Sequence, residues 1–235
     1  MRILFIGNTR LGDAILSTPI LDFYCKKNNH ITVICSTLSG EIYSSFSKVK
    51  TIIAVKKKKR GLHWLEVYLK LESIKWDLVI DLRNTIISRL IRKKKILRFK
   101  SQNKLQHKVK EYCNFIGLTT IKFPNIPKNN LHITEIKNLI TKYRIKSPIL
   151  AVAPFTNWKR KDWPLKNYKQ LILKLLEKKY FSSVIILGSV DEKDDCYKLE
   201  KELRVNTVFN FAGLLKIKEI FELLKVCSFF IGNDS

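Results

Sequence analysis

An aspartate near the N-terminus stands where a phosphate-binding loop would need a cation. Gly7 and Gly12 have the G-x-x-x-x-G spacing of such a loop and follow an apolar run, residues 3–6. A loop of that kind continues with Lys and then Ser or Thr, because the ammonium group must reach phosphate oxygens. Asp13 follows Gly12 instead, at the start of a helical pattern whose positive end would stabilise a carboxylate. Two interpretations are open: an ionised general base, or a first-turn residue that only supports the helix.

A second loop combines hydrogen-bond donors and cations just before a helix. In "APFTNWKRKDWPLKNY", residues 153–168, a strand ends at Pro154, and Pro164 suits the first turn of the next helix. Hydrogen-bond donors and cations at a helix N-terminus suit the binding of a diphosphate. The alternative interpretation is a solvated basic loop that binds no ligand. The polar residues between the two prolines are Thr156, Asn157, Lys159, Arg160 and Lys161.

A third turn follows an apolar strand at the end of the sequence. "FFIGNDS", residues 229–235, leads from that strand to Gly232, Asn233, Asp234 and Ser235. In parallel sheets, ligands bind at the carboxyl ends of the strands, on loops that lead into helix N-termini. We therefore expect all three turns to face one ligand-binding cleft.

Strand and helix patterns alternate along the chain. Short apolar runs separated by amphipathic helices indicate parallel strands covered on both faces, and so an α/β, doubly wound fold. In the first helix, Pro19 is expected to cause a kink or a restart, with Ser17 or Thr18 as the cap. Strands are expected at residues 2–6, 31–36, 51–55, 77–81, 95–99, 149–154, 183–187, 207–211 and 228–231, and helices at residues 12–25, 62–75, 104–117, 134–143, 164–179, 192–204 and 216–226.

The alternation weakens in the middle of the chain. "TTIKFPNIPKNN", with two prolines and three asparagines, is typical of an irregular loop, and a new apolar strand begins in "SPILAVAP". We place a domain boundary near residue 145. Two Rossmann-like domains are predicted, residues 1–145 and 146–235, with the cleft between them.

The net charge of +25 is the most unusual feature of the composition. It indicates a polyanionic partner, either a nucleic acid or an anionic membrane surface. The alternative is the Lys-, Ile- and Asn-rich coding of an AT-rich genome. Two lysine clusters, residues 56–60 and 92–100, lie in the first half of the chain.

Other classes of protein find little support in the sequence. It has neither a signal peptide nor an apolar run near the roughly 18 residues of a membrane span, so a cytoplasmic protein is expected. The five cysteines are scattered without C-x-x-C spacing, and the four histidines are dispersed. This pattern indicates buried free thiols rather than a zinc or iron site.

Taken together and in order, these segments resemble glycosyltransferase family 9, the ADP-heptose:lipopolysaccharide heptosyltransferases. "TRLGDAILSTP", residues 9–19, is similar to the family's opening motif R-x-G-A-L-G-D-x-I-L-x-T-P, and "KDWPLKNYKQLI", residues 161–172, to K-x-W-P-x-x-x-W/F. Residues 211–235 are similar to G-x-x-x-L-x-E-x-x-x-L followed by G-N-D-[ST]-G. Further family segments are similar to residues 76–91, 107–118 and 184–194. The likeness therefore runs from residue 1 to 235.

The resemblance implies a GT-B fold, with the acceptor in the N-terminal domain and the nucleotide sugar in the C-terminal one. It implies inverting, metal-independent transfer of a heptose or related sugar from an ADP-sugar to a lipid-linked inner-core acceptor, without a cofactor. Asp13 is then the catalytic base, facing Lys161 across the cleft. An anionic inner-membrane surface is a further candidate partner. On the donor side the resemblance assigns Lys161 and Thr156 to the phosphates, Glu192 or Asp191 to the ribose, and Asp234 to the donor sugar.

Two features depart from the family pattern. The family continues after G-N-D-[ST] with a Gly, an x-x-H and further strands and helices, so an incomplete C-terminal domain is expected. The alternatives are a truncated product, a fragment or half of a split gene, and an inactive fragment is one interpretation of this chain. Phe155 stands where many relatives have Gly or Ser.

Two other functions fit the sequence less well than sugar transfer. A nucleic-acid-binding protein would have aromatic residues interleaved with its basic runs, but residues 56–60 have none and residues 92–100 only Phe99. A dinucleotide oxidoreductase would have G-x-G-x-x-G after the first strand, which residues 7–12 lack.

Overall fold

The computed structural model describes residues 1–25, 28–56, 62–101, 105–156 and 158–233. The chain divides into two compact units, Met1–Lys128 and Asn129–Ser235, and each is described by itself. Both are α/β, with parallel sheets, as the sequence predicts.

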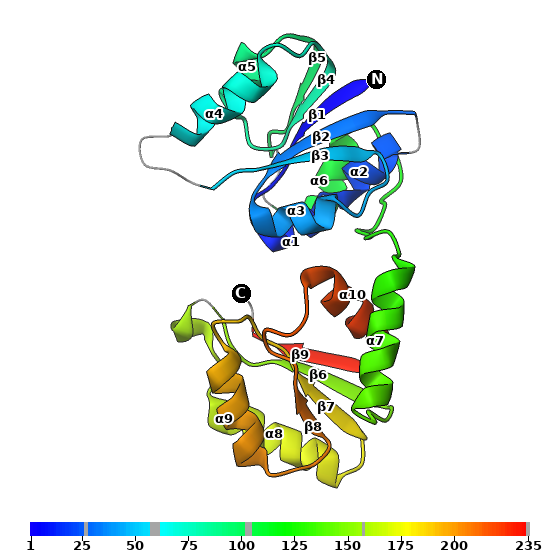
Figure 1. The fold of residues 1–235 in the computed structure, drawn as a ribbon, viewed down its shortest axis with the longest axis vertical. Coiled ribbons are helices and arrows are strands. Elements are labelled where there is room, and N and C mark those ends of the chain that lie inside the picture. Colours follow the sequence, from blue (N-terminus) through cyan, green and yellow to red (C-terminus); the bar gives the residue numbers. More distant parts are fainter. Residues whose placement is uncertain (26–27, 57–61, 102–104, 157, 234–235) are drawn as a thin grey trace. The chain divides into compact units, whose positions relative to one another are not determined.

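The first unit is built on a sheet whose described strands are all parallel (Figure 1). Its order, β3-β2-β1-β4-β5, places β1 at the centre, with the loop that carries Asp13 at its carboxyl end. The strands are β1 (Arg2–Ile6), β2 (His30–Cys35), β3 (Val49–Ala54), β4 (Trp76–Asp81) and β5 (Lys93–Arg98).

Helices cover both faces of this sheet, because alternate residues of each central strand point to opposite sides. Ile3 and Phe5 of β1 pack in one core with α1 (Leu11–Leu16), α2 (Thr18–Cys25), α3 (Thr37–Tyr43) and α6 (Lys108–Phe115). Leu4 and Ile6 pack in the other with α4 (Leu62–Leu71) and α5 (Ile87–Leu90). The doubly wound prediction is thus confirmed for this unit.

The predicted helix over residues 12–25 is two helices. α1 ends at Leu16 and α2 starts at Thr18, so that Pro19 occupies the first turn of α2, where no backbone N–H is needed. The expected restart is confirmed. The Ser17 and Thr18 hydroxyls donate to the carbonyls of Ala14 and Ile15. They therefore bond to backbone carbonyls at the end of α1 and do not cap the start of α2, contrary to the prediction from the sequence.

The second unit has a smaller parallel sheet in the order β8-β7-β6-β9. Tyr168 and Ile172 lie in the core on one face, and Ile136 and Leu223 in the core on the other. The strands are β6 (Ile149–Ala153), β7 (Ser183–Ile186), β8 (Val208–Asn210) and β9 (Phe229–Gly232); α8 (Leu165–Glu177) and α9 (Lys193–Leu203) cover the first face, and α7 (Asn130–Lys142) and α10 (Ile217–Val226) the second.

The division between the units falls after Lys128, earlier than the boundary predicted near residue 145. The reason is α7, whose buried Ile136 packs with Ile145 and Ile149 in the core of the second unit. The amphipathic pattern of α7 predicts a helix but does not say which sheet its apolar face covers.

β9 lies at the edge of the second sheet and pairs with β6. Its Phe229 and Phe230 are 59% and 50% exposed.

Candidate active site

Asp13 lies in the first turn of α1, directly after the loop that follows the central strand β1. It is half-buried, and within the described residues no hydrogen bond or ion pair engages its carboxylate. Asp81, at the end of the neighbouring strand β4, contrasts with it: that buried carboxylate accepts the N–H groups of Arg83 and Thr85 at 2.9 and 2.7 Å. Asp81 therefore holds a loop, whereas Asp13 is left able to take a proton.

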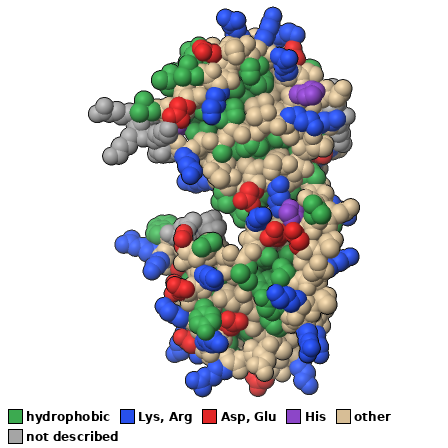
Figure 2. Space-filling view, viewed as in Figure 1, with side chains coloured by type: hydrophobic (Ala, Val, Ile, Leu, Met, Phe, Trp, Pro, Cys, Tyr) green, Lys and Arg blue, Asp and Glu red, His purple; other side chains and the backbone are tan. Residues whose placement is uncertain are grey.

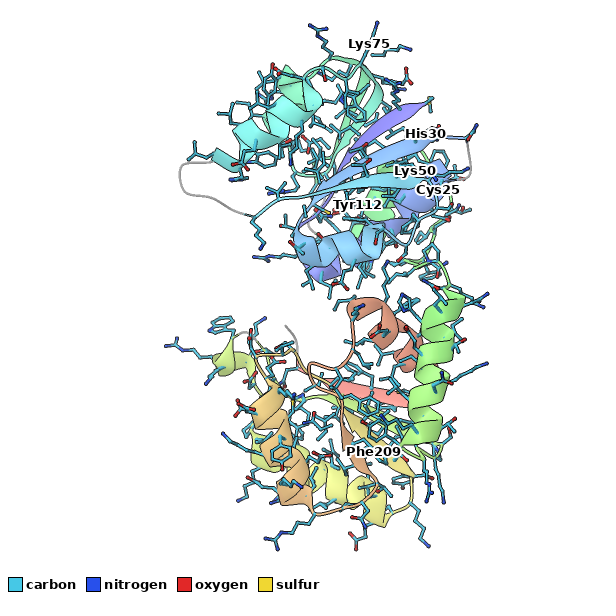
Figure 3. The ribbon with its side chains drawn as sticks, in the orientation of Figure 1. Cys25, His30, Lys50, Lys75, Tyr112 and Phe209 are labelled. Atoms are coloured by element: carbon cyan, nitrogen blue, oxygen red, sulfur yellow. The ribbon has the colours of Figure 1, made fainter. Side chains whose placement is uncertain are left out.

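A polar network fixes the loop before α1 and the first turn of α1, which carries Asp13. The Asn8 side-chain amide donates to the backbone carbonyl of Asp13 at 3.1 Å and to the hydroxyl of Tyr112 at 3.0 Å (Tyr112 is labelled in Figure 3). The Asn8 backbone N–H donates to the hydroxyl of Tyr43, which is also 3.0 Å from the Ser17 hydroxyl. The loop is thus held from α3 and α6 at once.

The two tyrosines of this network stay protonated. Burial raises the pKa of Tyr43, and burial is also the main cause of the raised pKa of Tyr112, to which the nearby charge of Asp13 adds. Their hydroxyls therefore hold the loop over the whole physiological pH range. Asn8, Tyr43 and Tyr112 are not predicted from the sequence; for Tyr112, the likeness of residues 107–118 to a family segment is the only signal.

The two glycines of this loop differ in what they allow. A Cβ at Gly7 would lie 2.7 Å from the ring of Tyr43, so glycine is required for the close approach. A Cβ at Gly12 would meet no atom within 4 Å. At Gly12, next to Asp13 in the chain, the space that a side chain would occupy is therefore open.

A pocket of about 510 Å³, here called the strand-end pocket, lies at the carboxyl ends of β1, β2 and β3. The Ser36 hydroxyl donates to the Thr9 carbonyl at 2.7 Å and so joins this pocket to the Asp13 loop. The Arg83 guanidinium carbon lies 5.5 Å from the centre of the Trp64 ring. The pocket is lined by Thr9, Ser36, Val55, His63, Trp64 and Arg83.

The predicted phosphate loop of the second unit is a tight turn. The Thr156 hydroxyl lies 2.8 Å from a carboxylate oxygen of Asp162 and accepts the N–H of Trp158 at 3.1 Å. Its single hydrogen is thus already used within the loop. Lys161 ends the short helix η2 (Lys159–Lys161), is exposed, and places its ammonium 5.7 Å from the centre of the Trp158 ring.

Asn233 holds this loop from the end of β9. Its side-chain oxygen accepts the Trp163 N–H at 3.0 Å and the Tyr168 hydroxyl at 2.9 Å, and its amide donates to the Pro154 carbonyl at 2.6 Å. One residue thus joins both ends of the loop and the first turn of α8. Within the described residues, no side chain caps that turn, so its N–H groups suit an anion.

In the acidic turn after β7, one carboxylate already accepts a backbone hydrogen bond from the same turn. Glu192 is half-buried and accepts the Ser189 N–H at 2.7 Å, whereas Asp191 is exposed. The ribose contact predicted for Glu192 would therefore use the remaining acceptor sites of its carboxylate. Asp234 and Asn157 lie outside the described residues.

The cysteines are free thiols. Burial raises the pKa of Cys35 to about 11 and that of Cys196 to about 12, so the reactive thiolate is scarce near neutral pH. Cys35, Cys113 and Cys196 are buried, as the sequence predicts, whereas Cys25 and Cys227 are only partly buried. One group of metal-ligand types does converge among the described residues, namely His132, Glu135 and Glu219. Hydrogen bonds account for it: His132 lies 2.9 Å from Glu135, and Glu219 accepts the Lys216 N–H at the start of α10.

The basic run at residues 92–100 does not have the form of a nucleic-acid surface. It contributes β5, and Phe99 is buried at 7% exposure, so its ring is not available to stack on a base. Of the other run, residues 57–60 lie outside the described part. The nucleic-acid interpretation therefore has no support.

Parallel sheets with helices on both faces, in two units with loops of this kind at the strand ends, define an α/β protein of the GT-B class. The model of glycosyltransferase family 9 (heptosyltransferase) matches residues 88–235. The chain belongs to this family and is a glycosyltransferase. No curated protein sequence matches it.

Solved structures agree on the fold. A family 9 glycosyltransferase from Veillonella parvula matches with a TM-score of 0.79 and 16% identity, over 100% of this chain and 75% of that one. The ADP-heptose lps heptosyltransferase II of E. coli matches at 0.72 and 15%, over 100% and 80%. The E. coli heptosyltransferase WaaC with ADP-2-deoxy-2-fluoro heptose matches at 0.71 and 15%, over 100% and 83%.

The fold alone does not fix the reaction. A UDP-GlcNAc 2-epimerase from Neisseria meningitidis also matches, with a TM-score of 0.54 and 14% identity, over 100% of this chain and 78% of that one. Sugar transfer is therefore assigned by the family and not by the architecture.

Proposed function

We propose that this chain transfers a heptose, or a closely related sugar, from an ADP-sugar to a lipopolysaccharide inner-core acceptor, with inversion and without a metal. The family supports the reaction class. The two E. coli relatives, described as an ADP-heptose lps heptosyltransferase and as bound to an ADP-heptose analogue, support this donor and acceptor class.

The observation that carries the proposal is the available carboxylate of Asp13. In inverting transfer, the acceptor hydroxyl oxygen attacks the anomeric carbon, the bond from that carbon to the diphosphate breaks, and ADP leaves with the bonding electrons. Asp13 takes the proton of the attacking hydroxyl. A positioned base contributes about 10² to 10⁴ in rate, and the network from Asn8 to Tyr112 supports such positioning.

The strand-end pocket is proposed to hold the acceptor saccharide. Trp64 offers an aromatic ring for packing against a sugar, and Arg83 offers a cation for a carboxylate or phosphate on it. An acidic sugar such as Kdo fits these two groups.

The donor is proposed to bind the second unit. Negative charge develops on the diphosphate as ADP leaves, and Lys161 and the N–H groups of the first turn of α8 would stabilise it. Thr156 would contribute a further phosphate contact only if its hydroxyl exchanges Asp162 for the ligand. Glu192 is proposed to meet the ribose and Asp234 the sugar.

A lipid-linked acceptor implies where in the cell the protein acts. None of the described helices is long and apolar enough to cross a bilayer. We propose that the protein acts in the cytoplasm, at the inner face of the membrane that contains its lipid-linked acceptor.

The test is direct transfer. The purified chain, with ADP-heptose, a Kdo-bearing acceptor and a metal chelator, should release ADP and extend the acceptor by one heptose, as seen by mass spectrometry. UDP-GlcNAc serves as the matched control donor. Product from UDP-GlcNAc but not from any ADP-sugar, or a need for metal, would contradict the proposal.

A further inference from the structure

Five large apolar side chains stand exposed on two neighbouring helices of the first unit. Three lie on α4, one precedes α5 and one ends it, and each is 57–61% exposed. Single exposed leucines are common on protein surfaces, but a group of this size marks an interaction site. The members of this group, here called the α4–α5 patch, are Leu62, Leu65, Leu69, Ile86 and Leu90.

Their spacing puts them on outward faces. Leu62, Leu65 and Leu69 follow the i, i+3, i+7 pattern of one helical stripe. Val67 and Leu71 of the same helix are 4% and 1% exposed and pack on the sheet. α4 is therefore apolar on two sides, and its own unit covers only one of them.

The second helix also has an exposed apolar side. Ile87 and Ile91 are buried in the core that α4 also covers, while Ile86 and Leu90 point away from it. α4 and α5 contact each other on this face of the sheet (Figure 1). Figure 2 shows apolar side chains at the surface of this part of the unit, with both basic and acidic side chains near them.

The charges beside the patch are mostly positive. Exposed carboxylates on α4 and just after it are Glu66 and Glu72. Cations outnumber them on the two helices and the segments that follow: Lys70, Lys75, Arg89 and Arg92 are all exposed (Lys75 is labelled in Figure 3). A surface that combines leucines with cations matches an anionic lipid bilayer, which accepts apolar side chains below its charged headgroups.

We propose that the α4–α5 patch attaches this protein to an anionic membrane surface. A second copy of the chain fits the patch poorly, because it would bring the same cations together in a protein of net charge +25. The inference deepens the proposed function and rests on it in one respect, since the lipid-linked acceptor lies in such a bilayer.

The experiment is co-sedimentation of the full chain with vesicles. Wild-type protein should bind vesicles that contain phosphatidylglycerol much more tightly than vesicles of phosphatidylcholine alone, and binding should weaken as salt rises. The double variant Leu65→Ser/Leu90→Ser should bind at least tenfold more weakly. Arg89→Gln/Arg92→Gln should reduce binding to the anionic vesicles and flatten its salt dependence.

Leu131→Ser is the matched control, because Leu131 is a 72% exposed leucine on a helix outside the patch. It should bind like wild type, and all variants should unfold at the wild-type temperature because the replaced side chains are exposed. Undiminished vesicle binding by the Leu65→Ser/Leu90→Ser variant would overturn the inference. So would equal binding to both kinds of vesicle, or a dimer in sedimentation equilibrium that the same variant abolishes.

Transfer to a deacylated, water-soluble acceptor separates this inference from the proposed function. Patch variants should keep wild-type turnover on that acceptor. A chain that transfers the sugar but binds no vesicles would refute the patch alone, whereas a chain that binds vesicles through the patch but transfers no sugar would refute the proposed function alone.

Discussion

The side-chain amide of Asn8 donates to the hydroxyl oxygen of Tyr112 across 3.0 Å, between residues 104 positions apart in the chain. The same amide holds the backbone carbonyl of Asp13. One asparagine therefore connects the proposed base to α6, so the position of Asp13 depends on a helix that the sequence places far away.

Removing the hydroxyl of Tyr112 tests this connection. Tyr112→Phe should cost about 1 kcal/mol of unfolding free energy, the usual contribution of one hydrogen bond, and should lower turnover because Asp13 loses its fixed position. Thermal unfolding and steady-state kinetics measure the two effects. Tyr24→Phe is the control, a half-buried tyrosine on α2, and it should change neither. Unchanged turnover in Tyr112→Phe would show that the loop is held without this bond.

Asp13→Asn should leave donor binding at its wild-type level and reduce turnover by about 10² or more, because the amide cannot accept the hydroxyl proton. Calorimetry with the ADP-sugar and a rate assay separate the two. Asp22→Asn serves as the control, since Asp22 forms a partly exposed ion pair with Lys122 at 3.5 Å. Near wild-type turnover of Asp13→Asn would refute its role as the base.

The two glycines of the same loop should respond differently to alanine. Gly7→Ala forces a Cβ to 2.7 Å from the Tyr43 ring, and overpacking of this kind costs about 1–3 kcal/mol. Gly12→Ala meets open space and should unfold like wild type. Chemical denaturation of both variants makes the comparison. If the two variants lose the same free energy of unfolding, the close approach of Tyr43 is not the reason that position 7 requires glycine.

Much of the fold can be read from the sequence, because buried parallel strands are short continuous apolar runs. Every expected strand is present, with ends shifted by a few residues at most. The short α3 was not predicted, although Ser36 and Ser39 form a capping box that could have indicated it. The assignment of α7 to the second unit depends on packing, which the pattern of one helix does not contain.

The site was only partly predictable, for a similar physical reason. Asp13 could be found because its chemistry and its place after a strand are both local. Asn8 and Tyr112 could not be paired, since nothing in one sequence states which distant hydroxyl meets which amide. The bond of Thr156 to Asp162 is equally invisible, although it limits the predicted phosphate contact.

Lys161→Ala should weaken binding of the ADP-sugar about tenfold or more, in line with the loss of a charge-assisted hydrogen bond. Lys159→Ala provides a matched control, because Lys159 is exposed on the same short helix. Calorimetric titration with the ADP-sugar and with ADP measures the affinity of both variants for each ligand. Equal affinities for the two variants would move the phosphate site away from Lys161.

Asn233→Ala should lower both the stability and the donor affinity, because this one side chain makes three hydrogen bonds to the proposed phosphate loop and α8. The loss leaves the Trp163 N–H and the Pro154 carbonyl without their partner, at a cost of about 1–3 kcal/mol. The loop that carries Lys161 would also lose its tie, so donor affinity should fall although Asn233 need not contact the donor. Asn210→Ala is the control: Asn210 accepts one N–H, that of Ala212, and its loss should lower stability less and leave donor affinity unchanged. Wild-type donor affinity in a destabilised Asn233→Ala protein would show that the tie supports the fold alone.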